Sequence, residues 1–196
     1  ATEVLPMIDR SSKPAGAADV FTIGFGTTAV MWAAGYACRL FGDAVPPAVI
    51  FGLLIAGLLG GGFVAGRATS RGVGGGILAG LLAGLLNLLI VGSLMSGSTP
   101  NEIKRGALLW IPGTLVVCAA VCAAGAGVGR ALRRGPGGVA VPPAQDWPGL
   151  FAGVVVCATF LLLAAGGLVT GFDEGLAVVD WPNTEGYNMF LYPLAR

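Results

Sequence analysis

The chain has 196 residues, of which 55% are hydrophobic and 11% are charged, with a net charge of +1 and no histidine. Soluble domains carry about a quarter charged residues, so this composition predicts an integral membrane protein. The near-neutral charge argues against a nucleic-acid partner, which would require a concentrated basic patch. The absence of histidine excludes His-ligated haem, most zinc sites and His-based acid–base catalysis within this sequence.

Residues 1–19 form a polar N-terminal segment of mixed charge. The segment lacks the short apolar core and the small-residue cleavage site of a secretory signal peptide, so no such signal is expected here. The apolar part of the chain begins directly after it, at about residue 20.

Five later segments are long and apolar enough to cross a membrane, since a spanning helix needs about 20 mostly apolar residues. They predict an all-α polytopic membrane protein with about five transmembrane helices. Only a few residues separate the second and third segments, which therefore form a tight antiparallel hairpin. The predicted spans are residues 20–40, 48–66, 72–95, 107–129 and 148–170.

The basic residues that flank these spans predict the orientation, because Lys and Arg are retained on the cytoplasmic side. With the N-terminus inside, seven basic residues lie on the inner side and four on the outer side. The N-terminus is therefore expected in the cytoplasm and the C-terminal loop outside it. The inner set is Arg10, Lys13, Arg67, Arg71, Arg130, Arg133 and Arg134, and the outer set is Arg39, Lys104, Arg105 and Arg196.

Glycines recur every four residues in the second and third predicted spans. This spacing places them along one helix face, where helix backbones can approach closely. We expect the two helices to pack on each other through these faces, and a pore lined by glycine is the alternative. The glycines are Gly57 with Gly61, Gly62 with Gly66, and Gly72, Gly76, Gly80 and Gly84.

Few polar side chains lie within the predicted spans. Asn87 either donates a hydrogen bond to another helix or marks a substrate path. No Asp, Glu, Lys or Arg lies in mid-membrane, which disfavours a proton-coupled transporter or pump. The four cysteines lie in or beside apolar runs and are predicted to be small buried hydrophobes, although Cys118 and Cys122 share a helix face and a pair there is conceivable. The other two are Cys38 and Cys157.

A stretch rich in Pro and Gly at residues 135–147 predicts a linker and a module boundary. Upstream, residues 20–134 form a four-helix glycine-rich membrane module. Downstream, residues 148–196 form one helix and an external segment. That segment carries four carboxylates, and its aromatic side chains suit a solvated loop at the membrane interface. Acid–base work by the carboxylates has little support without a histidine or a metal cluster.

The order of residues at this C-terminal end is more specific than an interfacial loop requires. An apolar helix ends in GGLVT at residues 166–170, followed by GLAV at 175–178, DWPN at 180–183 and GYNMF at 186–190. The arrangement resembles the first transmembrane helix and first external loop of the haem A synthase family. The resemblance covers residues 161–194, and its NMFL variant is similar to one bacterial branch of the family.

The resemblance implies an oxidoreductase of cytochrome oxidase assembly, in the cytoplasmic membrane of a bacterium with its loop on the periplasmic side. Such an enzyme oxidises the methyl group of haem O to a formyl group in haem A biosynthesis. The family's catalytic Glu and its His residues follow this loop and cannot be carried over, and the Thr-Glu-Gly setting of Glu185 does not match the family's Glu-x-x-His-Arg. The chain is therefore expected to be the N-terminal part of a synthase, inactive alone, with haem only in the complete protein.

Three residues of the loop are candidates for the wall of a haem pocket. By the resemblance, Trp181 and Pro182 form a rigid apolar wall and Asp180 hydrogen-bonds the turn. The partners implied are the lipid bilayer and haem O.

Two alternatives remain open. One is a non-catalytic membrane scaffold or assembly subunit that packs through its glycine-rich faces against partner helices or further copies of the chain. The other is a small channel or transporter built by oligomerisation of the glycine-rich hairpin.

Overall fold

The computed structural model describes residues 17–40, 44–94, 106–135, 138–139, 144–171, 183–184 and 187–188. Within these ranges it contains five α-helices, and each includes a stretch long and apolar enough to cross a membrane. The predicted all-α class with five spans is confirmed, and the chain is an integral membrane protein. The helices are α1 Ala18–Leu40, α2 Pro47–Ala68, α3 Val73–Leu94, α4 Ala107–Arg133 and α5 Trp147–Gly171.

Three helices extend into charged residues beyond the apolar limits expected from the sequence, and one of them, α2, runs through Arg67 to Ala68. α1 begins at Ala18 and so includes Asp19 in its first turn, and α4 continues to Arg133 with Arg130 also in its last turn. A carboxylate near a helix N-terminus and guanidinium groups near a C-terminus both interact favourably with the helix dipole. Charged residues can therefore continue a helix where an apolar criterion ends it.

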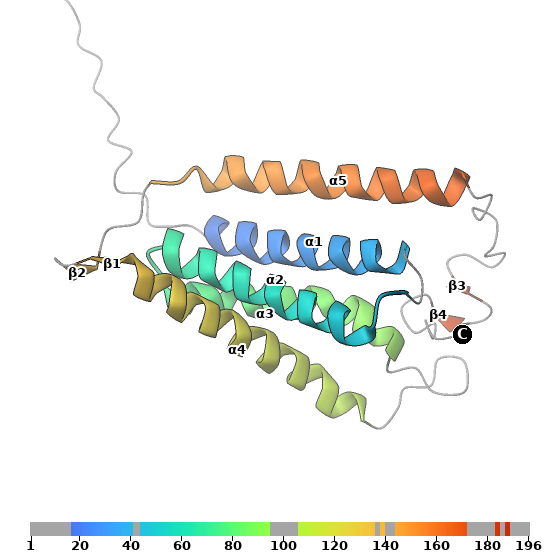
Figure 1. Ribbon diagram of the computed structural model, residues 1–196, viewed down its shortest axis with the longest axis horizontal. Helices are drawn as coiled ribbons and strands as arrows, with labels where there is room; N and C mark the ends of the chain where they lie inside the picture. The colour runs from blue at the N-terminus through green and yellow to red at the C-terminus, as the bar shows by residue number, and fades with distance from the viewer. Residues whose placement is uncertain are drawn as a thin grey trace, which may run out of the picture.

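The helices lie side by side in the order α5, α1, the α2–α3 pair and α4 (Figure 1). α2 and α3 form the expected antiparallel hairpin. The turn between them passes through Gly72, whose φ of 56° is readily adopted only by glycine. α1 and α4 pack on the hairpin from opposite sides, and α5 packs along the outer side of α1.

The regularly spaced glycines of α3 lie against α4. A Cβ atom at Gly80 would come within 2.6 Å of the Cys118 carbonyl oxygen, and one at Gly76 within 2.6 Å of the Ala126 Cβ. These distances are too short for a real Cβ, so only glycine permits this approach of the two helices. The expectation that the glycine faces pair α2 with α3 is wrong, because α4 covers the glycine face of α3.

α2 is in close contact with two helices. Gly62 and Gly66 lie against backbone carbonyls of α4, whereas Gly61 lies against a threonine of α1. In the same way, Gly125 and Gly129 of α4 lie against backbone carbonyls of α2. A carbonyl oxygen in the place of a Cβ faces the glycine Cα–H group, and such contacts are weak hydrogen bonds that recur between close helices. The α2–α4 interface is thus an interlocked backbone contact.

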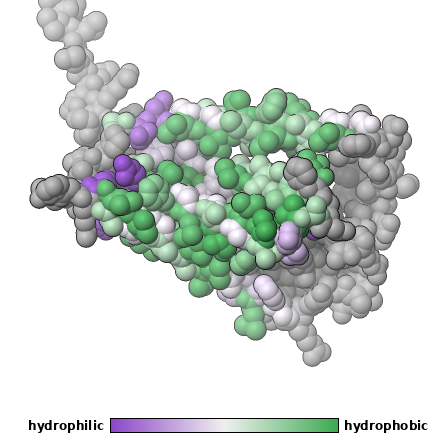
Figure 2. Space-filling view, in the orientation of Figure 1, coloured by the Kyte–Doolittle hydropathy of each residue, from purple (hydrophilic) through white to green (hydrophobic). Residues whose placement is uncertain are grey.

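The side chains buried between the helices are mostly small. Large apolar side chains are instead exposed on every helix, and Figure 2 shows them along the length of the bundle. Such a surface would be anomalous in water but suits contact with lipid tails. The two buried apolar clusters are Met31, Leu58, Ala83, Cys118 and Cys122, and Ile23, Ala65 and Ala79.

The cysteines only partly follow the prediction. Cys118 and Cys122 are buried as expected, and the Cys122 Sγ donates a hydrogen bond to the Leu58 carbonyl oxygen at 3.2 Å. Cys38 is half-buried. Cys157 was predicted to be buried, but it is exposed because α5 packs on other helices along one side only. All four are free, so Cys118 and Cys122 do not form a disulfide.

Two short antiparallel ladders accompany the helices. In the predicted linker, β1 Arg134–Gly135 pairs with β2 Gly138–Val139. Directly after the DWP motif, β3 Asn183–Thr184 pairs with β4 Tyr187–Asn188. Figure 1 places the second ladder at the end of the bundle where α1 ends and α4 begins. β3 and β4 therefore lie at this end of the bundle.

The α2–α4 contact makes a paired prediction at two glycines of one helix. Gly62→Ala introduces a Cβ onto the Cys122 carbonyl and is expected to lower the free energy of unfolding by about 1–3 kcal/mol through overpacking. Gly60 has nothing within 4 Å of the added atom. Gly60→Ala is therefore expected to be neutral or to stabilise α2 by up to about 1 kcal/mol. The free energies of unfolding of the two variants are measured by denaturant unfolding in one detergent, followed by circular dichroism. Equal stability of Gly62→Ala and Gly60→Ala would contradict the interlocked interface.

Candidate functional site

The three loop residues predicted from the sequence, Asp180, Trp181 and Pro182, lie outside the described residues. The structure describes the chain up to Gly171 on one side of them and from Asn183 on the other. Within the described part of the chain, two other features stand out. They are an apolar groove beside α5 and a polar cluster at the opposite end of the bundle.

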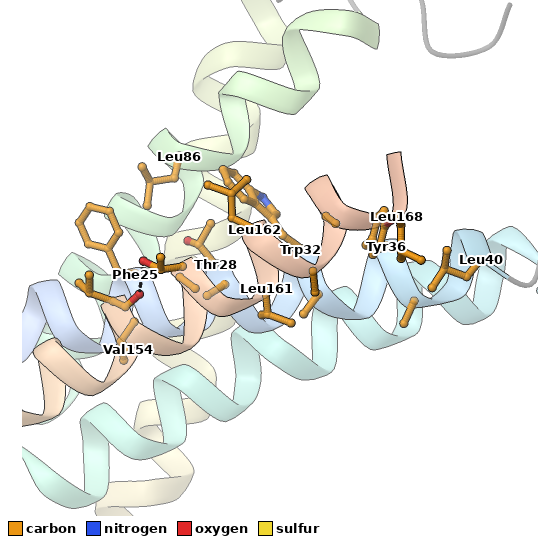
Figure 3. Close-up of a pocket in the computed structure, with 18 residues that line it drawn as sticks. Phe25, Thr28, Trp32, Tyr36, Leu40, Leu86, Val154, Leu161, Leu162 and Leu168 are labelled. Atoms are coloured by element: carbon orange, nitrogen blue, oxygen red, sulfur yellow. Dashed lines mark hydrogen bonds between the residues drawn. The ribbon is translucent and has the colours of Figure 1, made fainter. Parts of the chain in front are cut away.

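The groove lies between α1 and α5 and has a volume of about 720 Å³ (Figure 3). α1 lines it from Phe25 to Leu40 and α5 from Val154 to Leu168, and α3 adds Leu86. It therefore runs along the second half of both helices. This is the half nearer to the point where the C-terminal segment leaves α5.

The groove opens because α1 and α5 touch mainly at their first turns. The rings of Phe25 and Phe151 meet edge to face with centroids 5.8 Å apart. The Thr22 hydroxyl donates to the Trp147 carbonyl oxygen at 3.1 Å. Further along, three alanines of α1 lie among the larger Trp32, Tyr36 and Leu40 in the groove wall, and these small side chains leave space between the two helices. These alanines are Ala29, Ala33 and Ala37.

Asn87 of α3 lies next to the groove and contacts one of the residues that line it, Trp32. Its Oδ1 accepts a hydrogen bond of 2.9 Å from the indole nitrogen of Trp32, and its Nδ2 lies 3.8 Å from the sulfur of Met31. The interpretation of Asn87 as a hydrogen-bonding residue between helices is thus confirmed. Asn87 itself does not line the groove, but it fixes the ring of Trp32, which does.

The groove wall is almost entirely apolar. Its lining residues include no charged side chain and no His, Cys or Met. The hydroxyls of Thr28 and Thr159 donate to carbonyl oxygens of their own helices, to Gly24 at 2.9 Å and Val155 at 2.8 Å. Among the described residues no group of three or more His, Cys, Asp or Glu could hold a metal ion. The groove suits hydrocarbon, and the phenol of Tyr36 is the one ionisable group among its lining residues.

The polar cluster begins at the first turn of α1. The Asp19 side chain is only 1% exposed, and its Oδ2 lies 3.3 Å from the Nε of Arg71, which belongs to the turn between α2 and α3. Its Oδ1 accepts the backbone N–H of Val20 at 2.8 Å. This pair is not evident from the sequence, because Asp19 falls just outside the apolar span. A carboxylate beside one span and an arginine between two others was the available signal.

Arg133 closes the same end. Its Nη1 donates to the carbonyl oxygen of Thr69 at 2.8 Å and to that of Arg67 at 3.4 Å. The hydroxyl of Thr69 in turn donates to the Ala65 carbonyl at 2.7 Å. Carbonyls at the end of a helix have no partner within it, so these bonds satisfy groups that would otherwise be left open. The last turn of α4 therefore caps α2.

The fold and these two features define an integral membrane bundle with a lipid-accessible apolar groove and a charged end. No protein-family model, curated protein or solved structure matches this chain. The chemistry of its own residues therefore carries the functional argument.

The Asp19–Arg71 pair makes an asymmetric prediction. Removing one partner of a fully buried pair costs about 3–5 kcal/mol. Because the Arg71 side chain is 35% exposed, we expect Arg71→Gln to cost about 2 kcal/mol, since it leaves a buried carboxylate. Asp19→Asn is expected to cost less, because Arg71 can turn toward water. The free energy of unfolding of both variants in one detergent checks this, and a larger loss for Asp19→Asn would contradict it.

Proposed function

We propose that this chain is the N-terminal portion of a membrane protein similar to the haem A synthases. In the complete protein, the methyl group of haem O is oxidised to the formyl group of haem A for terminal oxidase assembly. One observation carries the proposal: the GLAV, DWPN and GYNMF motifs of residues 175–190 follow directly on a membrane-spanning helix, α5, that ends at Gly171. The family's loop follows its first helix in this same way.

The packing of α5 supports this interpretation. α5 packs along α1, and no residue in the apolar core of its span is buried. Its side chains Phe160, Leu162 and Leu163 are each about 70% exposed. A helix with one side held and the other open can pack against further helices through van der Waals contact. Within the proposal, those helices belong to the synthase domain that α5 begins.

Haem is the group that the resemblance implies, and the residues present do not fit it as ligands. The sequence has no histidine, and the groove lining has no His, Cys or Met. We therefore assign no haem-iron ligand to this chain and place the catalytic residues in the remainder of the complete protein. What this chain supplies, in the proposal, is the four-helix module, α5 and the loop whose Asp180, Trp181 and Pro182 shape the outer side of the haem pocket.

The orientation in the proposal has the N-terminus in the cytoplasm of a bacterium and the DWP loop on the periplasmic side. Its support is the gathering of basic residues at one end of the bundle. Arg133 donates a hydrogen bond to the Arg67 carbonyl oxygen, so these two residues lie at the same end of the bundle. Arg71 lies at this end too, because it pairs with Asp19 at the start of α1. Arg39 lies at the opposite end of α1. This asymmetry is the pattern that retains the basic end inside.

The scaffold alternative has to use a different surface from the one first expected. Gly62, Gly66, Gly76 and Gly80 are covered by α4 inside the bundle, so they are not open to partner helices or to another copy of the chain. The same holds for a channel formed by the glycine-rich hairpin. A scaffold would instead bind its partners on lipid-facing surface such as that of α5.

The loop makes a testable prediction in the complete protein. Trp181→Ala is expected to lower haem A formation by about 10- to 100-fold, the usual loss when a residue supporting a metal or haem site is removed. Trp110→Ala is the matched control, because Trp110 is 65% exposed and lies near the start of α4, at the same end of the bundle. Haem extracts separated by chromatography give the readout. Equal activity of both variants would reduce the loop to an interfacial anchor.

This chain by itself makes a spectroscopic prediction. Without histidine, the purified 196-residue chain is expected to bind no His-ligated haem, so its absorption spectrum after incubation with haem should lack the Soret band of a His-ligated haem. A clear band of that kind would contradict the assignment of the haem ligands to the remainder of the protein.

The reading frame downstream of Arg196 separates the two proposals. A continuation with Glu-x-x-His-Arg and further apolar helices is expected for the synthase. A stop codon close to Arg196 would favour the scaffold.

A further inference from the structure

Arginines from two helices and one turn lie at the same end of the bundle, where α2 and α4 end. We call Arg67, Arg71, Arg130 and Arg133 the arginine collar. Arg130 lies across the turn between α2 and α3, with its Cδ 3.3 Å from the place where a Cβ of Gly72 would lie. Arg133 holds the Thr69 carbonyl of the same turn. Figure 2 shows polar residues gathered at this end, where α1 begins and α4 ends.

Two members of the collar hold the fold together. Arg71 pairs with Asp19, and Arg133 donates to two carbonyls at the end of α2. Arg67 and Arg130 are exposed, and within the described ranges neither guanidinium has a hydrogen-bonding or ionic partner. These two are the members available to a ligand.

The described carboxylates at this end do not neutralise that charge. Asp19 is buried beside Arg71. Asp146 accepts the backbone N–H of Gly149 at 3.2 Å and so caps the first turn of α5. Helix dipoles favour arginines in a last turn, but the capping bonds to the end of α2 come from Arg133. Among the described residues, Arg67 and Arg130 therefore make no such capping bond.

The position of the collar selects the kind of anion. It stands at the ends of four membrane-spanning helices, where the polar headgroup layer meets the hydrocarbon core. On the membrane side of it, Val64 and Val128 are exposed apolar side chains on the same two helices. A phospholipid offers a phosphate to the guanidinium groups and acyl chains to this surface, whereas a free phosphate offers only the first.

We propose that Arg67 and Arg130 bind phosphate groups of anionic phospholipids in the leaflet at this end of the bundle. The planar guanidinium group matches a phosphate with two parallel hydrogen bonds, and basic pockets between membrane helices recognise anionic headgroups in this way. Arg71 and Arg133 position the turn and the helix ends that carry the site. The proposal does not depend on the haem-related function.

The test measures lipid selectivity of the full 196-residue chain. The protein is exchanged into mixed micelles of phosphatidylglycerol and phosphatidylcholine, and the retained lipid is measured by native mass spectrometry. Wild type is expected to retain phosphatidylglycerol preferentially. Arg67→Gln and Arg130→Gln are each expected to reduce that preference by roughly fivefold, the contribution of one basic residue near an anionic surface. Arg39→Gln, at the other end of α1, is expected to leave the preference unchanged.

Three results would overturn the proposal. The first is an unchanged preference in the Arg67→Gln, Arg130→Gln double variant with a native circular dichroism spectrum. The second is an equal loss in Arg39→Gln, which would indicate general charge attraction. The third is displacement of phosphatidylglycerol by inorganic phosphate, which would assign the site to a free anion. If the double variant does not fold, the single variants carry the test. In addition, a variant with lysine at both positions keeps the positive charge but loses the planar guanidinium groups, so it is expected to lose part of the preference for phosphatidylglycerol.

Discussion

Close backbone contact between α4 and the α2–α3 hairpin is the constraint on which the rest of the bundle depends. Lipid tails are as apolar as the helix surfaces, so burying leucine against leucine gives little net stabilisation in a membrane. What remains is dispersion between closely packed backbones and weak Cα–H···O contacts. Gly62 and Gly66 on α2, and Gly125 and Gly129 on α4, permit that approach from both sides. The large side chains are consequently left to face lipid.

This contact also determines the place of α1 and α5. Because α4 occupies the glycine face of α3 and one face of α2, α1 packs on the hairpin from the other side, where Gly61 meets Thr27. α5 then packs against the outer side of α1. The alanines of α1 leave the second half of that contact incomplete, and the groove results. The groove thus results because α5, which follows the Pro/Gly-rich linker in the sequence, contacts α1 mainly along its first turns.

The spans and the hairpin could be predicted from the sequence because each depends on local composition: about 20 apolar residues, or a short turn with glycine. The partner of each glycine face could not, because a four-residue spacing says that a neighbour comes close but not which one. The face of α4 that covers α3 is made of Cys118, Cys122 and Ala126 and shows no glycine repeat, whereas the face toward α2 carries Gly125 and Gly129, four residues apart. The Asp19–Arg71 pair likewise depends on tertiary contact between an N-terminal residue and a distant turn.

The two ends of the bundle differ in chemistry, and this difference links its structure to both proposals. At one end, Asp19, Arg71 and Arg133 tie α1, α2, α4 and their turn together through charge and hydrogen bonds. At the other, contacts around the groove are apolar, and the hydrogen bond from Trp32 to Asn87 is a neutral one. The charged end fixes the helices to one another, whereas toward the apolar end the exposed side chains of α5 can pack with further helices. The DWP loop leaves from the end where such packing is still open.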